Sequence, residues 1–178
     1  GDYSLTNLFV LYQDILSRLF DSQIMTLGLV YLGMAVILLL IFRSLKIALI
    51  ALVPNVCTTL GILGLIGWLG IPLDIMTITI AAIAMGIAVD DTIHFVHSYL
   101  QAPADTALKN AFAHTGMAML FTSVVIAAGF AVFGFSSFLP SVYFGLLTAA
   151  AMIIALAADL TILPALLSRF VKPATKAT

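Results

Sequence analysis

Charged residues are scarce in this sequence. Only 8% of its 178 residues are charged, and all eight acidic residues are Asp, because the chain contains no Glu. Soluble domains carry about 25% charged residues, so this supply of charge is too small for a water-soluble surface. The net charge of -1 also excludes the basic surface that nucleic-acid binding requires. We therefore expect the bilayer to be the solvent for most of the chain.

Cysteine, start signals and catalytic motifs are also lacking. The single cysteine, Cys57, excludes an internal disulfide and has no partner at a metal-ligand spacing. No basic stretch before a short apolar segment marks a signal peptide. The chain begins at Gly1 without a Met, which indicates a piece of a longer protein. No nucleophile has a base at a workable spacing and no cofactor motif is present, so neither enzyme activity nor a cofactor is expected.

Long apolar runs dominate what is present. The chain is 63% hydrophobic with a mean hydropathy of +1.22. Five runs approach the roughly 20 residues that a spanning helix needs, and none shows strand alternation. We therefore predict an all-α membrane fold, a five-helix transmembrane domain over 23–168. The predicted spans are 24–42, 47–69, 75–97, 113–135 and 141–163.

The segments around these spans have their own patterns. Residues 5–20 place apolar side chains at helical spacing, which predicts an amphipathic entry helix over 1–22 that continues into the first span. It would lie along or just outside the membrane. Asp74 reads as the N-cap of the third span, and Pro140 as a helix-start proline. The connection 98–112 is expected to be a loop that holds a short surface helix.

The cations predict an orientation. Six of the seven Lys and Arg residues fall on one side of the predicted spans, and only Arg18 falls on the other. Cytoplasmic loops carry the excess of positive charge, which predicts an outside N-terminus and an inside C-terminus. The 98–112 connection and the tail 169–178 are then cytoplasmic, in a multi-pass protein of the cytoplasmic membrane. The six cations are Arg43, Lys46, Lys109, Arg169, Lys172 and Lys176.

The third span carries the most informative polar residues. Asp90 and Asp91 follow fifteen residues without a charge. A charge at the centre of a bilayer costs about 2.5–3.5 kcal/mol on insertion scales, so such residues require a partner or a water-filled cavity. The pair could instead cap the cytoplasmic end of the helix. The apolar pattern continues beyond it at Ile93, Phe95 and Val96, which favours a functional role.

Helical spacing brings a histidine to this pair. His94 lies four residues after Asp90 and three after Asp91, so all three share one side of a helix. Two adjacent carboxylates cannot both be charged cheaply in a low dielectric, which suits a proton relay of Asp90, Asp91 and His94. We expect Asp90 to face the bundle interior, with Gly86 close to another helix. Asp90, His94 and His97 could be three metal ligands, but no fourth ligand is evident, so no metal site is expected.

Further polar and small residues are candidates for supporting roles. Thr122 and Ser123 lie near the middle of the fourth span, and Asp159 lies before Pro164 in the fifth. These three are possible polar partners of the relay, or groups that bond within their own helices. Small residues let helices approach closely in lipid. The glycines expected to pack in this way are Gly61, Gly64, Gly67 and Gly86.

Residues 86–95 (Gly-Ile-Ala-Val-Asp-Asp-Thr-Ile-His-Phe) resemble the Asp-bearing fourth helix of a half-transporter of the RND superfamily, in its MMPL-like and hopanoid-exporter-like branch. The resemblance implies helices two to six of one repeat, most similar to the C-terminal one. It implies proton antiport, with Asp90 and Asp91 as proton carriers and Thr122 or Ser123 as their hydroxyl partner. The implied partners are the other repeat, the first helix, extracytoplasmic domains, membrane lipids and a hydrophobic substrate. Supporting runs are 42–46, 52–55, 69–74, 121–123, 135–140 and 158–164.

Three functions follow from this resemblance. The first is the membrane half of a proton-driven exporter of lipids or other hydrophobic molecules. The second is a Sec-type protein-export subunit, against which the uncharged end of the third span at residues 97–101 argues. The third is a sterol- or lipid-sensing domain without transport, which has no need for the Asp90–Asp91 pair.

Overall fold

The computed structural model describes residues 2–71 and 75–173, and within them it forms helices joined by short turns, with no strand. Asp74 and Lys176 lie outside the described residues, whereas Pro140 stands in the first turn of its helix as predicted. The helices are α1 (Asp2–Phe42), α2 (Leu45–Trp68), α3 (Ile75–Gln101), α4 (Ala107–Asn110), the π-helix η1 (Ala111–Gly116), α5 (Met117–Ala131), the 3-10 helix η2 (Val132–Phe135) and α6 (Leu139–Phe170).

Five stretches of these helices are long and apolar enough to cross a membrane. The fourth of them combines α4, η1, α5 and η2 into one continuous run. The predicted all-α membrane fold with five candidate spans is therefore confirmed, and the direction in which the spans cross stays a prediction. The five stretches are Ile24–Phe42, Leu45–Trp68, Thr79–Gln101, Ala107–Phe135 and Leu139–Phe170.

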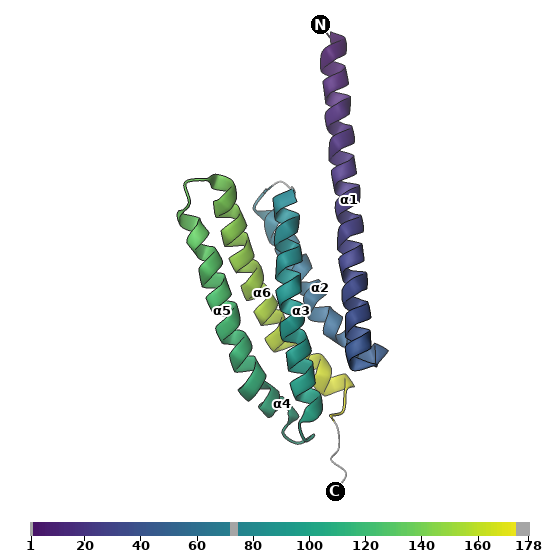
Figure 1. Cartoon of the computed structure of the whole chain (residues 1–178), viewed down its shortest axis with the longest axis vertical. Helices are drawn as coiled ribbons and strands as arrows, with labels where there is room; N and C mark the ends of the chain where they lie inside the picture. Colours follow the sequence, from purple (N-terminus) through teal and green to yellow (C-terminus); the bar gives the residue numbers. More distant parts are fainter. Residues whose placement is uncertain (1, 72–74, 174–178) are drawn as a thin grey trace.

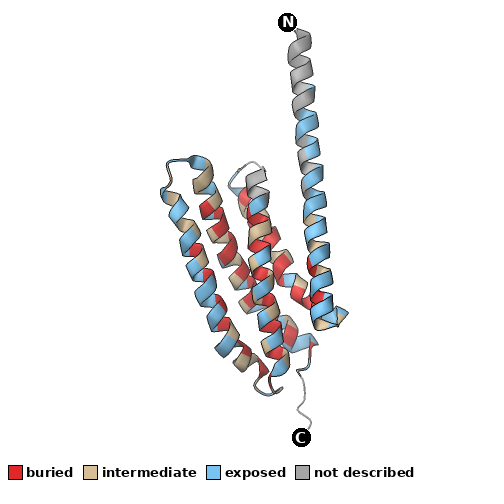
Figure 2. Ribbon diagram, viewed as in Figure 1, coloured by how far each residue is buried: buried red, intermediate tan, exposed pale blue. Residues whose placement is uncertain are grey.

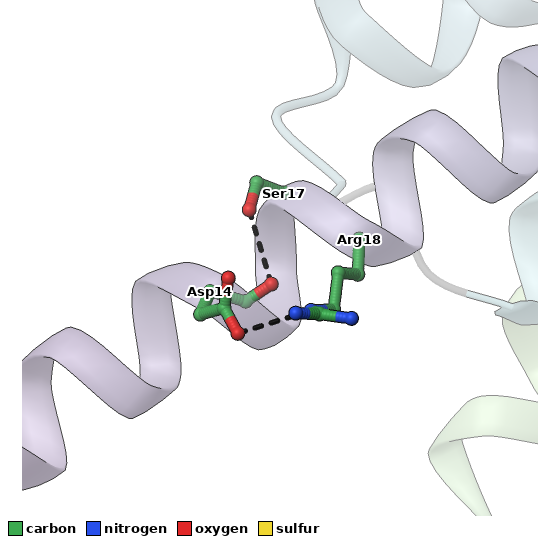
Figure 3. Close-up of polar contacts among 3 residues, drawn as sticks. All are labelled: Asp14, Ser17 and Arg18. Atoms are coloured by element: carbon green, nitrogen blue, oxygen red, sulfur yellow. Dashed lines mark hydrogen bonds and ion pairs between the residues drawn. The ribbon is translucent and has the colours of Figure 1, made fainter.

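The first half of α1 projects beyond the other helices (Figure 1). On its exposed surface, Arg18 Nε donates to Asp14 Oδ2 at 3.0 Å, and the Ser17 hydroxyl donates to the Asp14 carbonyl at 3.0 Å (Figure 3). No break separates this segment from the span Ile24–Phe42. It therefore continues the direction of the span as predicted from its pattern, and its position relative to the membrane surface stays a prediction.

Buried side chains concentrate on α2, α3 and α6 (Figure 2). α6 packs against α2, α3 and α5. Many buried positions on these helices are alanines, which allow the close helix approach that drives association in lipid. One apolar cluster includes Phe95 and Leu167, the other includes Ile66 and Leu147, and on α2 and α6 a layer of buried polar residues separates them.

The cations of the turns gather at one end of the bundle. Arg43, with a φ of 50°, forms the tight turn between α1 and α2. Lys46 Nζ lies 6.0 Å from the ring centroid of Phe170, which brings the start of α2 next to the end of α6. Lys109 belongs to the helix that follows the α3–α4 turn. This common end is the one for which the cations predict the cytoplasmic side.

The connection between the third and fourth spans is shorter than the predicted 98–112. α3 continues to Gln101, and the next helix begins at Ala107 and runs on into α5 instead of forming a separate surface helix. The last turn of α3 is held in place because Tyr99 is buried and its hydroxyl donates to the Val171 carbonyl at 3.0 Å. Pro103 lies two residues after the end of α3, where a helix interior would need a backbone N–H that proline lacks.

Candidate functional site

The two carboxylates of α3 point in different directions. Asp90 Oδ1 lies 3.6 Å from His94 Nε2, and these side chains are 72% and 68% exposed in this chain. Asp91, one residue further around the helix, is half-buried. The Ser123 hydroxyl of α5 donates to Asp91 Oδ2 at 3.5 Å. Asp91 therefore connects α3 to α5, whereas Asp90 and His94 form an exposed pair.

The expected interior position of Asp90 is wrong for this bundle. The side of α3 that is buried is set by small and apolar residues, and Asp90 lies on a different side. Gly86 shares the exposed side, and a Cβ atom added to it would have no heavy atom within 4 Å. Both sides of α3 are rich in small apolar residues, so their pattern did not reveal which side packs. The buried residues of α3 include Ala81, Ala84, Ala88, Thr92, Phe95 and Val96.

The carboxylate pair lines a pocket between α3 and the fourth span. The pocket has a volume of about 410 Å³, which is large enough for several water molecules. α3 contributes both carboxylates and the imidazole of His94. The facing wall mixes polar and apolar side chains of η1 and α5, which are His114, Thr115, Ala118, Met119 and Thr122. The structure therefore places the three predicted relay residues in the lining of one pocket.

The two candidate hydroxyls of α5 have different partners. Thr122 lines the pocket, but its hydroxyl donates to the carbonyls of its own helix, at 3.1 Å to Ala118 and 3.0 Å to Met119. Ser123 is buried and is the one whose hydroxyl reaches Asp91. Of the two, Ser123 is in position to respond to the charge on this carboxylate.

Asp159 approaches α3 from another side. It is 1% exposed, and the Thr92 hydroxyl donates to its Oδ1 at 2.7 Å. The Asn55 amide of α2 donates to Thr92 Oγ1 at 3.2 Å. Asp159 thus belongs to a buried network that joins α2, α3 and α6, and it is absent from the lining of the pocket. The network and the pocket meet on α3, because Thr92 of the network directly follows Asp91 of the pocket in the sequence.

This network continues toward α1. The Tyr31 hydroxyl donates to Thr59 Oγ1 at 2.6 Å, which ties α1 to α2. The Asn55 amide also donates to the Ala51 carbonyl of its own helix at 3.1 Å. Sequence reasoning singled out none of Tyr31, Asn55, Thr59 and Thr92 as site residues. The available signal was weak, because buried hydroxyls in a spanning helix usually bond within that helix.

Removing the hydroxyl of Thr92 is expected to destabilise the bundle. Thr92→Val keeps the shape but leaves Asp159 and the Asn55 amide without this partner, at a cost of about 1–3 kcal/mol for unsatisfied buried groups. The free energy of unfolding can be measured by SDS titration in mixed micelles. Thr161→Val is the matched control, since the exposed Thr161 hydroxyl bonds only to its own helix, and it should change little. Equal effects of the two substitutions would contradict this prediction.

The glycines predicted to mediate packing have different surroundings. A Cβ added at Gly61 would lie 3.0 Å from Ile154 Cγ2 on α6. A Cβ added at Gly64, Gly67 or Gly86 would have no heavy atom within 4 Å. Gly145 has the closest approach, because an added Cβ would lie 2.4 Å from the Phe130 carbonyl oxygen. Of the four predicted glycines, only Gly61 makes a close helix contact, and Gly145, which was not predicted, makes a closer one.

The remaining histidine of α3 lies outside the pocket. His97 is exposed, and its Nε2 lies 2.8 Å from the Gln101 amide nitrogen. The pocket lining does not include it. Among residues 2–71 and 75–173, no group of three His, Cys or Asp side chains is arranged to hold a metal ion.

Five candidate spanning helices indicate a multi-pass membrane protein, and a carboxylate pair lies in a pocket between two of these helices. The chain matches the MMPL family over residues 5–176. It therefore belongs to the MMPL family, whose members are RND-type membrane transporters and not enzymes. The resemblance drawn from residues 86–95 is confirmed at the level of the family.

A relative of the chain is also a membrane protein. A protein of Methanocaldococcus jannaschii that is named as a membrane protein is 28% identical over 152 residues. The aligned part covers 83% of this chain and 39% of that protein. The chain thus spans well under half the length of this relative, and its assignment to helices two to six of a C-terminal repeat stays a prediction.

Proposed function

We propose that this chain is the membrane part of a proton-driven RND exporter of lipids or other hydrophobic and amphiphilic molecules. Asp90 and Asp91 take up and release the coupling proton. The observation that carries the proposal is the carboxylate pair lining a pocket of about 410 Å³ between two candidate spans, in a chain of the MMPL family.

The physical argument starts from the cost of an intramembrane charge. A carboxylate at depth is tolerated where it faces a partner or water, and the pocket supplies room for water. Protonation removes the charge, and release restores it. The Ser123 hydroxyl bonds to Asp91, so a change in the charge of this carboxylate changes a contact between α3 and α5. Proton loading can thereby bias the packing of two helices, which is the event that coupling requires.

The membrane setting and the family support the proposed substrate class, and the remaining partners are proposals too. We propose that the other repeat, a first helix and extracytoplasmic domains of the same protein complete the transporter. The exposed pair of Asp90 and His94 lies where such a part of the protein could cover it. Membrane lipids surround the outward face, and the cytoplasmic membrane is the proposed location.

Coupled movement of lipid and protons tests this function. The complete protein is reconstituted in liposomes with a trapped pH dye, and fluorescent fatty acid and fluorescent phospholipid probes are supplied separately. We expect an imposed proton gradient to accelerate movement of a probe, with proton movement in step and loss of both on adding a protonophore. Probe binding without gradient-dependent movement would favour a lipid sensor. Gradient-dependent passage of an unfolded secretory protein, with no lipid movement, would favour a Sec-type subunit.

A further inference from the structure

The π-helix η1 brings His114 to the carboxylate pocket. Residues Ala111–Gly116 wind as a π-helix at the start of the fourth span, and His114 lines the pocket together with Asp90, Asp91 and His94. The sequence alone places His114 only near the start of a helix. Single π-turns inside α-helices occur frequently at functional sites. Two carboxylates and two imidazoles therefore line the pocket. One of the imidazoles, that of His114, has no role in the predicted relay of Asp90, Asp91 and His94.

The π-turn determines which way His114 points. Along the fourth span the buried residues Ala107 and Ala111 are four positions apart, and the next one, Gly116, follows at a step of five. The later ones, Met119, Ser123 and Ala127, follow at steps of three and four. Without the extra residue, an α-helix would continue its buried side at position 114 or 115. The π-turn instead buries Gly116, where an added Cβ would lie 3.5 Å from Leu160 of α6, and leaves His114 on the pocket side.

Helix geometry gives the order of these groups along the bundle. At 1.5 Å per residue, His94 and His114 each lie about 10 Å from the helix ends that meet at the α3–α4 turn. On the same scale the carboxylates of Asp90 and Asp91 lie about 15 Å from that turn, and Thr122 lies deeper still. The two imidazoles therefore stand between the carboxylates and the end of the bundle where the cations gather.

We propose that His114 is the group through which protons exchange between water at this end of the bundle and the Asp90–Asp91 pair. The proposal rests on the proposed function, in which these carboxylates carry the coupling proton. The His114 imidazolium gives its N–H proton to a water in the pocket, and that water passes a proton to a carboxylate. This leaves neutral imidazole and a protonated Asp, and a hydronium ion from the bulk water then protonates His114 again and becomes water. Imidazole suits this step because it exchanges protons near neutral pH.

The groups around His114 are consistent with this role. From α3 it faces the acceptors Asp90 and Asp91 and the imidazole of His94. α6 approaches the π-turn with the apolar Leu160, and its Asp159 is bonded to Thr92. In the preceding helix, Lys109 is exposed. His94 is already paired with Asp90 at 3.6 Å, which leaves His114 as the imidazole on the facing wall of the pocket.

The test measures proton arrival at the carboxylates without any substrate. The complete protein in liposomes receives a pH jump, and infrared absorption follows the protonated-carboxyl band that disappears in the Asp90→Asn, Asp91→Asn double variant. His114→Gln should slow the growth of this band by about tenfold or more, in line with the size of general acid–base effects. His97→Gln is the matched control, because His97 is an exposed histidine of α3 outside the pocket, and it should leave the rate unchanged.

Chemical rescue separates a proton-transfer role from a structural one. His114 is exposed, so His114→Ala removes no core contact and leaves space for a small base. Adding imidazole should restore the rate in His114→Ala and leave His97→Ala unaffected. A wild-type rate in His114→Gln, or a slow His114→Ala that imidazole does not restore, would overturn the proposal for His114. If the double Asn variant loses no carboxyl band, it is the proposed function of Asp90 and Asp91 that fails.

Discussion

Replacing both carboxylates, Asp90→Asn together with Asp91→Asn, is expected to abolish proton-driven export by the complete protein. Asn keeps the shape of the side chain but cannot take up a proton. Loading a carboxylate removes a charge whose burial costs about 2.5–3.5 kcal/mol, and a proton crossing 100 mV supplies about 2.3 kcal/mol, so the two quantities match. Without ionisable side chains the coupling between proton uptake and export is lost. The export rate measured in proteoliposomes should therefore fall to the rate seen without a proton gradient.

The single variants should differ. Asp91 is half-buried and accepts the Ser123 hydrogen bond, so its ionisation acts on the contact between α3 and α5. Asp90 lies on the exposed side with His94. We therefore expect Asp91→Asn to reduce gradient-dependent export more than Asp90→Asn, although the sequence alone predicts that Asp90 faces the bundle interior.

Asp105→Asn, in the exposed α3–α4 turn, is the control for loss of a carboxylate as such, and it should export normally. Membrane insertion of all variants should match wild type. If the double variant exports at the wild-type rate with unchanged proton dependence, the pair is structural and this part of the protein carries no coupling site.

The five spans could be predicted from the sequence because spanning a bilayer imposes a strong and local requirement. Each run must be apolar over about 20 residues and must bond its own backbone. Helix ends are set by side-chain contacts that are not local. The buried hydroxyl of Tyr99, bonded to Val171, extends α3 beyond the end that composition indicates.

Much of the candidate site could also be predicted, because Asp90, Asp91 and His94 interrupt an apolar run at helical spacing. The directions in which these side chains point could not be predicted, because in lipid the apolar residues of a helix do not distinguish its packed side from its exposed side. Thr92 was missed because it is a common residue among apolar ones, and its contact with Asp159 spans 67 positions of the chain. His114 was missed because its direction depends on the π-turn, which no motif announces.

Glycine spacing was a poor guide to packing for a related reason. Gly61, Gly64 and Gly67 recur every three residues, yet close contact is made at Gly61 and not at the other two. Gly145 belongs to no repeat. Its importance arises where α6 turns back against α5 and η2, and Phe130, Phe133 and Phe144 form ring contacts around this turn. Only the close approach of α6 to the backbone of Phe130 and to Phe133 shows that position 145 has no room for a side chain.

Gly145→Leu is therefore expected to prevent α6 from packing against α5. A Cβ at this position would lie 2.4 Å from both the Phe130 carbonyl oxygen and Phe133 Cβ, and neither atom is the movable end of a flexible side chain. Overpacking usually costs about 1–3 kcal/mol where neighbours can shift, and we expect a larger loss here because backbone must move. The folded fraction and the midpoint of thermal unfolding in detergent, measured by size-exclusion chromatography, should both fall.

Gly129→Leu provides the comparison on α5. Gly129 is exposed, and an added Cβ would meet no heavy atom within 4 Å. Because leucine favours a helix over glycine by up to about 1 kcal/mol, Gly129→Leu should be neutral or slightly stabilising. Gly145→Ala should lie between the two, since it adds the clashing Cβ and nothing beyond it. If Gly145→Leu unfolds at the same temperature as Gly129→Leu, α5 and α6 do not approach each other as closely as this structure requires.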